Sequence, residues 1–298
     1  MPCLNPIEGW LTPNGLSFKP PKGRISGDPI RVACRNCIAC KIDRSKEWAV
    51  RIMHHAQLHE ENMFVTLTYD EDNLPRDQGL HHEHFQLFMK RLRKYAWAHH
   101  KKKLSYYMCG EYGEKFGRPH YHAIIFGMKM PDTKKYGKLF NSETLEGLWG
   151  LGYTSIGTVT LESAAYVARY IMKKVTGDQA ENHYVKAFVD QDTGEIVDTF
   201  VVKPEYNRMS TKPAIGKEWF EMYENDFGND PENQICHING KQFPMPAYYL
   251  KRLKAQNPTK YESVMKARTE HARQNQPTDE ELEIRKLHYN HHLRKGKL

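Results

Sequence analysis

The chain has 298 residues, of which 39% are hydrophobic and 11% aromatic, so it can build a sizeable core and is not a disordered protein. Lys and Arg exceed Asp and Glu by eight. This basic excess favours a polyanionic partner, nucleic acid before membrane, although a merely soluble basic protein would have the same charge.

No segment is expected to enter a membrane. The longest apolar runs, such as 123–126, are far shorter than the about 20 residues of a membrane span. The start, "MPCLNPIEGW", lacks the basic and apolar regions of a signal peptide. We therefore expect the chain to stay in the cytoplasm, where its six cysteines are better interpreted as thiols or metal ligands than as disulfides.

The N-terminal part contains a cysteine cluster. Residues 1–33 are rich in Pro and Gly and are expected to be irregular. The evenly spaced Cys34, Cys37 and Cys40 follow, and Cys3 is available upstream. Four thiolates would complete a tetrahedral zinc site, and an iron–sulfur cluster or metal-free thiols are the alternatives. The remaining two cysteines, Cys109 and Cys236, are interpreted as ordinary thiols.

A helix is predicted from Ile42 onward, because apolar residues recur there at helical spacing. A strand at 63–70 and an amphipathic helix at 82–103 follow. The polar face of that second helix is strongly basic, with seven Lys or Arg and no acid between residues 85 and 103. Its candidate contacts to a nucleic-acid backbone are Lys90, Arg91, Arg93 and Lys94, and the alternative is a solvated charged face.

The next elements complete a sheet. The sequence predicts strands at 104–113, 119–127 and 152–160, a short helix at 145–150, and a helix at 162–175 that stops at Gly177. This order indicates an α+β fold, an antiparallel sheet flanked by helices of ferredoxin-like type. A hairpin of strands 184–190 and 196–204, a short helix at 216–226 and a polar tail from about residue 256 follow.

The strand "PHYHAIIFG" carries His120 and His122 two residues apart. Side chains at this spacing share one face of a strand, so the two imidazoles form half of a metal site. Glu111, at the end of the neighbouring strand, is the favoured third ligand over Glu114 in the connecting turn. The pair alone is weak evidence, because His82 has the same spacing from another histidine and because two imidazoles can simply be hydrogen-bonded.

A second constellation lies on the predicted helix at 162–175. Tyr166 and Tyr170 are four residues apart and therefore share one face of that helix. Arg169, Lys173 and Lys174 lie close by, which suits contact with phosphate. Tyrosines at this spacing are often only core packing. Combined with metal ligands on a neighbouring strand, however, they indicate phosphoryl transfer through a covalent phosphotyrosine.

Taken together, these motifs resemble the HUH endonucleases. "PHYHAIIFG" is similar to their histidine–hydrophobic–histidine motif, "FVTLTYD" to their first motif, and "YVARYIMKK" to the two-tyrosine motif of rolling-circle initiators. The spaced cysteines, "EYGEKFGRPHYH" and "MSTKPAIGKEWF" resemble the replication initiators of gokushovirus-type microviruses, which are small single-stranded DNA phages. The resemblance covers about residues 1–220.

The resemblance implies a role for each matching residue. His120 and His122 would bind Mg²⁺ or Mn²⁺ with Glu111, and Tyr166 and Tyr170 would be the paired nucleophiles. Lys173 or Lys174 falls near the basic residue that often accompanies them. The implied activity is nicking and rejoining of single-stranded or extruded origin DNA in the cytoplasm of a bacterial host, through a 5′-phosphotyrosine link and a free 3′ hydroxyl.

The implied partners are a host DNA polymerase, which would extend that hydroxyl, and a host helicase, because the chain has no Gly-x4-Gly-Lys-Ser/Thr loop. Two other functions stay open: a non-enzymatic zinc-containing nucleic-acid-binding protein, and a water-using metal-dependent nuclease. We expect four consecutive segments: a Cys-rich segment with a helix at 1–58, the nuclease core at 59–178, a hairpin and short helix at 179–246, and a helical tail at 247–298.

Overall fold

The computed structural model describes residues 3–12, 15–20, 29–114, 116–170, 174–175, 179–189, 193–227 and 234–294. The chain divides into two compact units. The sheet unit comprises Trp48–Met222 and Ile238–Lys241, and the terminal unit comprises Met1–Glu47, Tyr223–His237 and Gln242–Leu298. The terminal unit therefore contains both ends of the chain. Among the described helices, none has the length and apolar character needed to cross a membrane.

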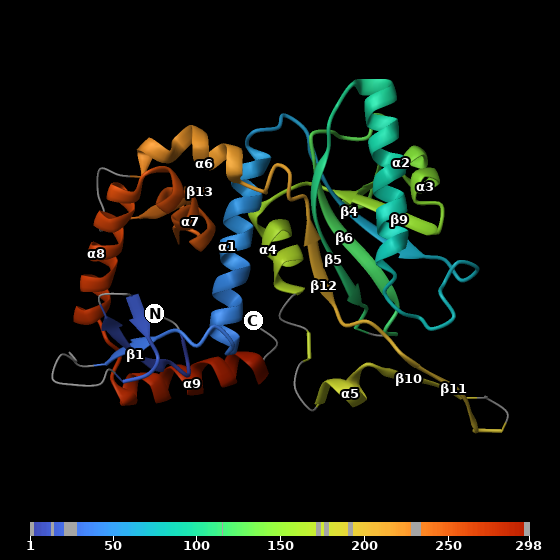
Figure 1. Ribbon diagram of the computed structural model, residues 1–298. Coiled ribbons are helices and arrows are strands. Elements are labelled where there is room, and N and C mark those ends of the chain that lie inside the picture. Colours follow the sequence, from blue (N-terminus) through green and yellow to red (C-terminus); the bar gives the residue numbers. More distant parts are fainter. Residues whose placement is uncertain are drawn as a thin grey trace. The chain divides into compact units, whose positions relative to one another are not determined.

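The sheet unit is built on an antiparallel sheet with the strand order β12-β5-β6-β4-β9-β8-β7 (Figure 1). Its central elements, in chain order, are β4 (Asn62–Tyr69), α2 (His82–His100), β5 (Ser105–Tyr112), β6 (Pro119–Phe126), α3 (Glu143–Trp149) and β9 (Gly152–Gly157). Their strand order, β5-β6-β4-β9, places the first strand between the third and the fourth, as in ferredoxin-like folds. The predicted α+β fold, with an antiparallel sheet flanked by helices, is confirmed.

Helices cover both faces of this sheet. One face carries Leu67, Tyr121 and Ile125, which pack with apolar side chains of α2 and α3. The other face lies against α4 (Leu161–Arg169) and the second half of α1 (Ile38–Ala56) (Figure 1). Complete burial of each large apolar side chain stabilises the fold by about 1.5–3 kcal/mol. Because successive side chains along a strand point to opposite faces, each residue of the central strands faces one of these two helix layers.

Helix α4 begins at a capping box and is shorter than the sequence predicts. The Thr160 side chain accepts a hydrogen bond from Ser163 N, and the Ser163 hydroxyl accepts one from Thr160 N. The helix ends at Arg169, and residues 174–175 are not helical, so the predicted span of 162–175 is wrong at its C-terminal end. The backbone N–H of Val175 instead donates to the Tyr184 hydroxyl. The predicted C-cap, Gly177, lies outside the described residues.

Further elements extend the sheet unit. They are β7 (Lys134–Tyr136), β8 (Leu139–Asn141), α5 (Gln179–His183), β10 (Val185–Val189), β11 (Ile196–Val201), β12 (Tyr206–Met209) and α6 (Lys217–Tyr223). The 3₁₀ turn (Glu224–Asp226) that follows α6 belongs to the terminal unit. The predicted hairpin is confirmed by the antiparallel β10–β11 pair. Strand β12, which the sequence did not predict, pairs with β5 and so removes a free edge beside the candidate metal ligands.

The terminal unit combines strands from the start of the chain with helices from its end. Strands β1 (Ile7–Thr12), β2 (Gly15–Ser17) and β3 (Ile30–Val32) form an antiparallel sheet, so the expectation that residues 1–33 are irregular is wrong. The other elements are α7 (Ala247–Gln256), α8 (Pro258–Gln274), α9 (Asp279–Arg294) and the pair β13 (Ile235–Ile238) and β14 (Lys241–Pro244), which spans the unit boundary.

Candidate functional site

Two imidazoles and a carboxylate converge at one end of the β5–β6 hairpin. The strand register places Glu111 opposite His120 and Cys109 opposite His122. Glu111 Oε1 lies 2.9 Å from His120 Nε2 and 2.7 Å from His122 Nε2. Ligand atoms of these three residues lie within 4.8 Å of one another, so the structure brings together the three residues that the sequence proposed as a metal set. Glu114 lines the same cleft but does not belong to this cluster.

The neighbouring strand orients one of the imidazoles. Thr66 of β4 pairs with His122 in the sheet, and its Oγ1 lies 2.9 Å from His122 Nδ1. The hydroxyl can donate to Nδ1 or accept a hydrogen bond from an Nδ1–H. In the second case it stabilises the tautomer that leaves the Nε2 lone pair available to a metal ion. The other ring, of His120, needs the space above Gly113: a Cβ on that glycine would lie 3.1 Å from His120 Cε1.

Glu111 is charged although it is buried. Burial alone would raise the pKa of this carboxyl, but the hydrogen bonds from His120 and His122 and the charge of these imidazoles outweigh it and lower the pKa to about 2. A carboxylate and two Nε2 atoms are ligands that suit a divalent ion such as Mn²⁺ or Mg²⁺. The donor chemistry, the convergence on one oxygen and the support of His122 by Thr66 therefore fit a cation at this point.

Both candidate nucleophiles lie over this cluster. The Tyr166 ring contacts the His122 ring edge-on with centroids 5.1 Å apart, and the Tyr166 hydroxyl donates to Glu111 Oε1 over 3.4 Å. The Tyr170 ring stacks on His122 at 5.8 Å. The two tyrosines differ in exposure, because Tyr166 is 38% exposed and Tyr170 only 5%. Burial raises the pKa of both phenols, and the carboxylate of Glu111 raises it further.

A cleft of about 640 Å³ opens over these groups. Its walls include Glu111 and His120 of the metal set, both tyrosines and two residues of the β5–β6 connection, Phe116 and Arg118. The cleft therefore gives a ligand access to a candidate cation site and to two hydroxyl nucleophiles at once.

The structure does not bring the predicted basic residues of α2 to this cleft. Helix α2 packs on the opposite face of the sheet, where its buried residues meet Tyr121 and Ile125. All four of its candidate DNA contacts are exposed, namely Lys90, Arg91, Arg93 and Lys94. The Arg91 guanidinium donates to the backbone oxygens of Leu148 and Trp149 at the end of α3, at 2.7 and 2.6 Å. Part of its hydrogen-bonding capacity therefore serves the fold.

The remaining basic candidates belong to the α4 segment. Arg169 is exposed on the last turn of α4, and Lys174 is exposed beyond the helix. Lys173 lies outside the described residues.

Sequence reasoning missed two features of the site. Thr66 lies within "FVTLTYD", but that motif does not reveal that its hydroxyl meets His122, because the pairing of β4 with β6 joins residues far apart in the chain. Phe116 lies in the turn between the predicted strands at 104–113 and 119–127, and the motifs predict no role for it. The signal that could have found Phe116 is the turn itself, since an apolar ring between glycine-rich positions of an exposed connection has no place in a core.

The cysteine cluster lies in the terminal unit. Ligand sulfurs of Cys3, Cys34, Cys37 and Cys40 lie within 4.8 Å of one another. Zinc–sulfur bonds of about 2.3 Å in a tetrahedron place the sulfurs about 3.8 Å apart, and Cys3 Sγ lies 3.8 Å from Cys37 Sγ. Burial raises the pKa of Cys37, but hydrogen bonds from the backbone N–H groups of Leu4 and Cys40 help to lower it to about 6, which favours a thiolate.

The other two cysteines are separate from this cluster. Cys109 and Cys236 are both buried, at 0% and 2% exposure. Burial raises the pKa of Cys236 to about 12, as expected for an unreactive thiol.

Comparison with known proteins identifies the family. A family model described as replication-associated protein ORF2/G2P matches residues 62–175, the part of the chain that holds the whole cleft cluster. The replication-associated protein VP4 of Bdellovibrio phage phiMH2K is 34% identical over 88% of this chain and 80% of its own length. The chain belongs to this family of phage replication-associated proteins.

Two further relatives of the family agree. The replication-associated protein ORF4 of Chlamydia phage 1 is 33% identical over 72% of this chain and 52% of its own length. The replication-associated protein ORF2 of Spiroplasma virus 4 is 31% identical over 85% and 80%. No solved structure matches the chain. The resemblance to phage replication initiators that the motifs indicated is thereby confirmed at the level of the family.

Proposed function

We propose that this replication-associated protein is a replication initiator endonuclease that nicks one DNA strand at a phage origin and later rejoins it. The observation that carries the proposal is the convergence of His120, His122 and Glu111 beneath a tyrosine whose hydroxyl lies 3.4 Å from Glu111 Oε1. A metal-ligand set and a hydroxyl nucleophile in one cleft suit phosphoryl transfer.

The proposed step is a transesterification. The phenolic oxygen of one tyrosine forms a bond to the scissile phosphorus, and the bond from phosphorus to the 3′ oxygen breaks. The phenol loses its proton, and the 3′ oxygen gains one to become a hydroxyl. Because burial raises the pKa of both phenols, the nucleophile is protonated at neutral pH and loses its proton as the new bond forms. No water is consumed, so the energy of the broken phosphodiester bond is retained in the phosphotyrosine link and is available for rejoining.

The cation would be Mg²⁺ or Mn²⁺, with His120, His122 and Glu111 as its ligands. When bound, such an ion would withdraw charge from the scissile phosphate and stabilise the charge that develops there. The chain's own contribution is to keep both Nε2 atoms aimed at one point, through the β5–β6 register and through Thr66.

Two tyrosines allow a second cut without release of the first strand end. After replication regenerates the origin, the second tyrosine cuts it, and the freed 3′ hydroxyl attacks the first phosphotyrosine to close a circle. A host polymerase would extend the first 3′ hydroxyl, a host helicase would unwind the duplex, and the reaction would take place in the bacterial cytoplasm. Exposed basic residues such as Arg169, with those of α2, would contact the DNA backbone.

The test uses single-stranded oligonucleotides that tile the genome encoding the chain. Each is incubated with the protein and Mn²⁺, and the mixture is then denatured. We expect a covalent protein–DNA adduct on a single segment and a free 3′ hydroxyl on the other product. Cleavage without an adduct would favour the water-using nuclease, and binding without cleavage would favour the non-enzymatic binding protein.

Tyrosine variants identify the nucleophiles. Replacing both Tyr166 and Tyr170 by Phe should abolish the adduct, whereas each single replacement should leave some if both phenols are competent. Tyr136→Phe is the matched control, because this exposed tyrosine lies on β7, away from the cleft. Adducts that persist in the double variant would refute the assignment.

We also propose a structural zinc ion on Cys3, Cys34, Cys37 and Cys40. Elemental analysis of protein purified without chelators should find zinc, and Cys37→Ser should lose the ion and destabilise the terminal unit. Cys236→Ala is the control, because this thiol lies outside the cluster. Iron together with visible charge-transfer absorption would instead indicate an iron–sulfur cluster.

A further inference from the structure

The connection between β5 and β6 carries an unusually exposed aromatic ring. Phe116 is 87% exposed, more than any other large apolar side chain in the part of the chain that the structure describes. The ring lines the same cleft as Glu111 and the two tyrosines. An exposed aromatic ring at the mouth of a catalytic cleft has no role in the core and is available to a ligand.

The turn that carries Phe116 is closed by two backbone hydrogen bonds. Gly113 N donates to Arg118 O and Gly117 N donates to Gly113 O, both over 2.9 Å. Gly117 has a φ of +59°, which glycine adopts without strain. The Arg118 side chain then fixes the end of the turn, because its guanidinium donates to Tyr69 O over 3.1 Å and pairs with Glu71.

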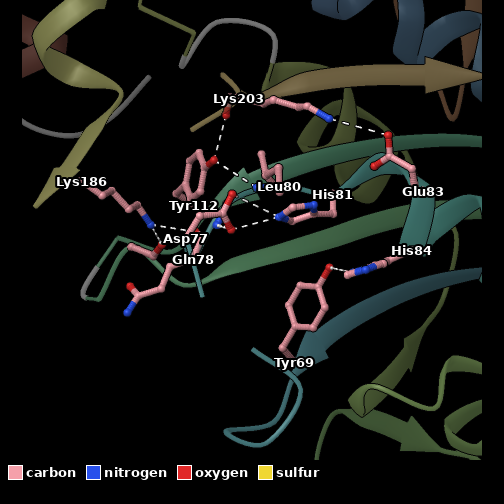
Figure 2. Close-up of polar contacts among 12 residues, drawn as sticks. Tyr69, Asp77, Gln78, Leu80, His81, Glu83, His84, Tyr112, Lys186 and Lys203 are labelled. Atoms are coloured by element: carbon pink, nitrogen blue, oxygen red, sulfur yellow. Dashed lines mark hydrogen bonds and ion pairs between the residues drawn. The ribbon is translucent and has the colours of Figure 1, made fainter. Parts of the chain in front are cut away.

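A lysine from the β10–β11 hairpin clamps the same turn. Lys186 Nζ donates to Gly117 O over 3.0 Å and to Gln78 O over 2.9 Å, and it lies 4.6 Å from the centre of the Tyr112 ring. Figure 2 shows the Lys186 side chain reaching toward Gln78 and the 77–81 segment. That segment is itself held, because the Tyr112 hydroxyl accepts from Leu80 N over 3.2 Å. The ring of Phe116 is therefore presented from a braced turn.

We infer that Phe116 is a stacking platform for an unpaired base of single-stranded DNA beside the scissile phosphate, and that Lys186 positions it. The inference rests on the proposed nicking function. Every base has a π-face, so an aromatic ring holds a single strand without regard to sequence. Because backbone hydrogen bonds already hold the turn, the main chain loses little conformational entropy when a base stacks on the ring.

The surroundings of the ring favour a base over a protein partner. Of the cleft-lining residues in its own turn, Glu114 and Arg118 are charged and Gly113 lacks a side chain. Protein-docking surfaces are contiguous apolar patches, whereas a single exposed ring with charged residues beside it in its turn matches the size of one base.

The first experiment measures binding of oligothymidylate to the Tyr166→Phe/Tyr170→Phe double variant, by fluorescence anisotropy. In this background, Phe116→Ala should weaken binding about tenfold, and Phe116→Trp should keep the affinity and show fluorescence quenching on binding. Tyr136→Ala is the control, because it removes another exposed ring, on β7. Equal affinities of Phe116→Ala and its parent would overturn the inference.

Two readouts separate stacking from a general loss of structure. Because stacking releases no counterions, Phe116→Ala should leave the slope of log K against log salt unchanged. A single abasic residue, moved along the oligonucleotide, should abolish the effect of Phe116→Ala at one position. If the loss persists at every position, the ring acts only on the shape of the protein, and the platform is disproved.

Lys186→Met tests the clamp. It should lower affinity for oligothymidylate, and a double-mutant cycle with Phe116→Ala should show that the two changes are not additive. Additive effects would remove Lys186 from the inference. Nicking of tiled oligonucleotides is measured separately, with protein that keeps both tyrosines. If nicking is normal and Phe116→Ala does not weaken binding, only the stacking platform is contradicted. If Phe116→Ala weakens binding but no adduct forms, only the proposed nicking is contradicted.

Discussion

At the residue scale, the cleft depends on one carboxylate shared by two imidazoles. Glu111 is only 2% exposed, and a buried carboxylate is stable only because both Nε2 atoms hydrogen-bond to it. The preference for Glu111 over Glu114 followed from its place on a strand, and the hairpin register puts it directly opposite His120. A side chain on a strand has a fixed direction, whereas one in a turn does not.

Thr66 provides a test of the proposed metal set. Thr66→Val keeps the shape of the side chain but removes the hydroxyl that meets His122 Nδ1. We expect the affinity for Mn²⁺, measured by isothermal titration calorimetry, to fall about tenfold, as is typical when a partner of a metal-binding histidine is lost. Thr199→Val, on the exposed part of β11, should leave it unchanged. Unaltered affinity in Thr66→Val would refute this role.

The two tyrosines should differ in the first cut. Tyr166 is the more exposed, and its hydroxyl contacts Glu111, whereas Tyr170 is buried with its ring on His122. In Tyr166→Phe only the buried Tyr170 can attack, and withdrawing its ring from the protein costs on the order of 2 kcal/mol. Adduct formation in a single turnover should therefore slow by about tenfold or more. Tyr170→Phe should retain most of the rate. Mass spectrometry of the trapped peptide checks this order, and an adduct found mainly on Tyr170 would reverse it.

At the element scale, α1 buries two uncharged histidines in the sheet unit. His54 stacks on Trp219 with centroids 3.4 Å apart, and His55 Nε2 lies 2.8 Å from Ser105 Oγ. Each is 1% exposed, and burial lowers the pKa of His54 to about 3 and that of His55 to about 4. The folded state therefore keeps both rings neutral under conditions in which an unfolded chain would protonate them.

This packing should make the sheet unit sensitive to acid. Below the unfolded pKa of about 6.5, each histidine should lower the free energy of unfolding by about 1.4 kcal/mol per pH unit, until the folded pKa is reached. Stability is thus fully present above pH about 6.5 and declines below it. Urea denaturation at a series of pH values checks this, and His55→Gln should reduce the slope. The exposed His99→Gln on α2 should not change it.

The sheet also separates two kinds of helix. Helix α4 and its C-cap residue Tyr170 place the two tyrosines on the face of His122, and α2 carries its basic residues on the other face. Both helices are amphipathic, but amphipathicity shows only that a helix packs on a sheet and not on which face. The role of the α2 residues in DNA binding therefore stays a prediction, and any such contact lies away from the cleft.

At the scale of the whole molecule, the terminal unit joins the two ends of the chain. Arg31 Nη1 donates to Pro277 O over 2.6 Å, although the residues are 246 positions apart. The Arg31 backbone N–H donates to Gln276 Oε1 over 2.8 Å, and its side chain pairs with Asp279. Strand β3 is thereby tied to the α8–α9 connection.

Arg31→Met should loosen this connection. The ion pair with the exposed Asp279 contributes little, so the main loss is the bond to Pro277 O, and we expect a destabilisation of about 1–2 kcal/mol. Thermal denaturation and limited proteolysis of the terminal unit measure it. Arg35→Met is the control, since Arg35 is exposed. If the protease cleaves both variants at the same rate as the parent protein, Arg31 does not hold the two ends of the chain together.

The sequence by itself determined what depends on local pattern. Alternation and helical spacing gave the central strands, the face shared by His120 and His122, and the pairing of Tyr166 with Tyr170. These follow because side-chain direction along a strand or helix has a fixed period. The cysteine spacing likewise indicated the cluster, although the contact between Cys3 and Cys37 depends on how segments distant in the sequence fold together.

Only the tertiary structure decided what depends on contacts between distant segments. These contacts are the pairing of β12 with β5, the sheet formed by β1–β3, the meeting of Thr66 with His122, and the clamp from Lys186 to the turn of Phe116. It also decided that α2 and α4 cover opposite faces. Such pairings are set by the global competition for burial and hydrogen bonds, which leaves no period in the sequence.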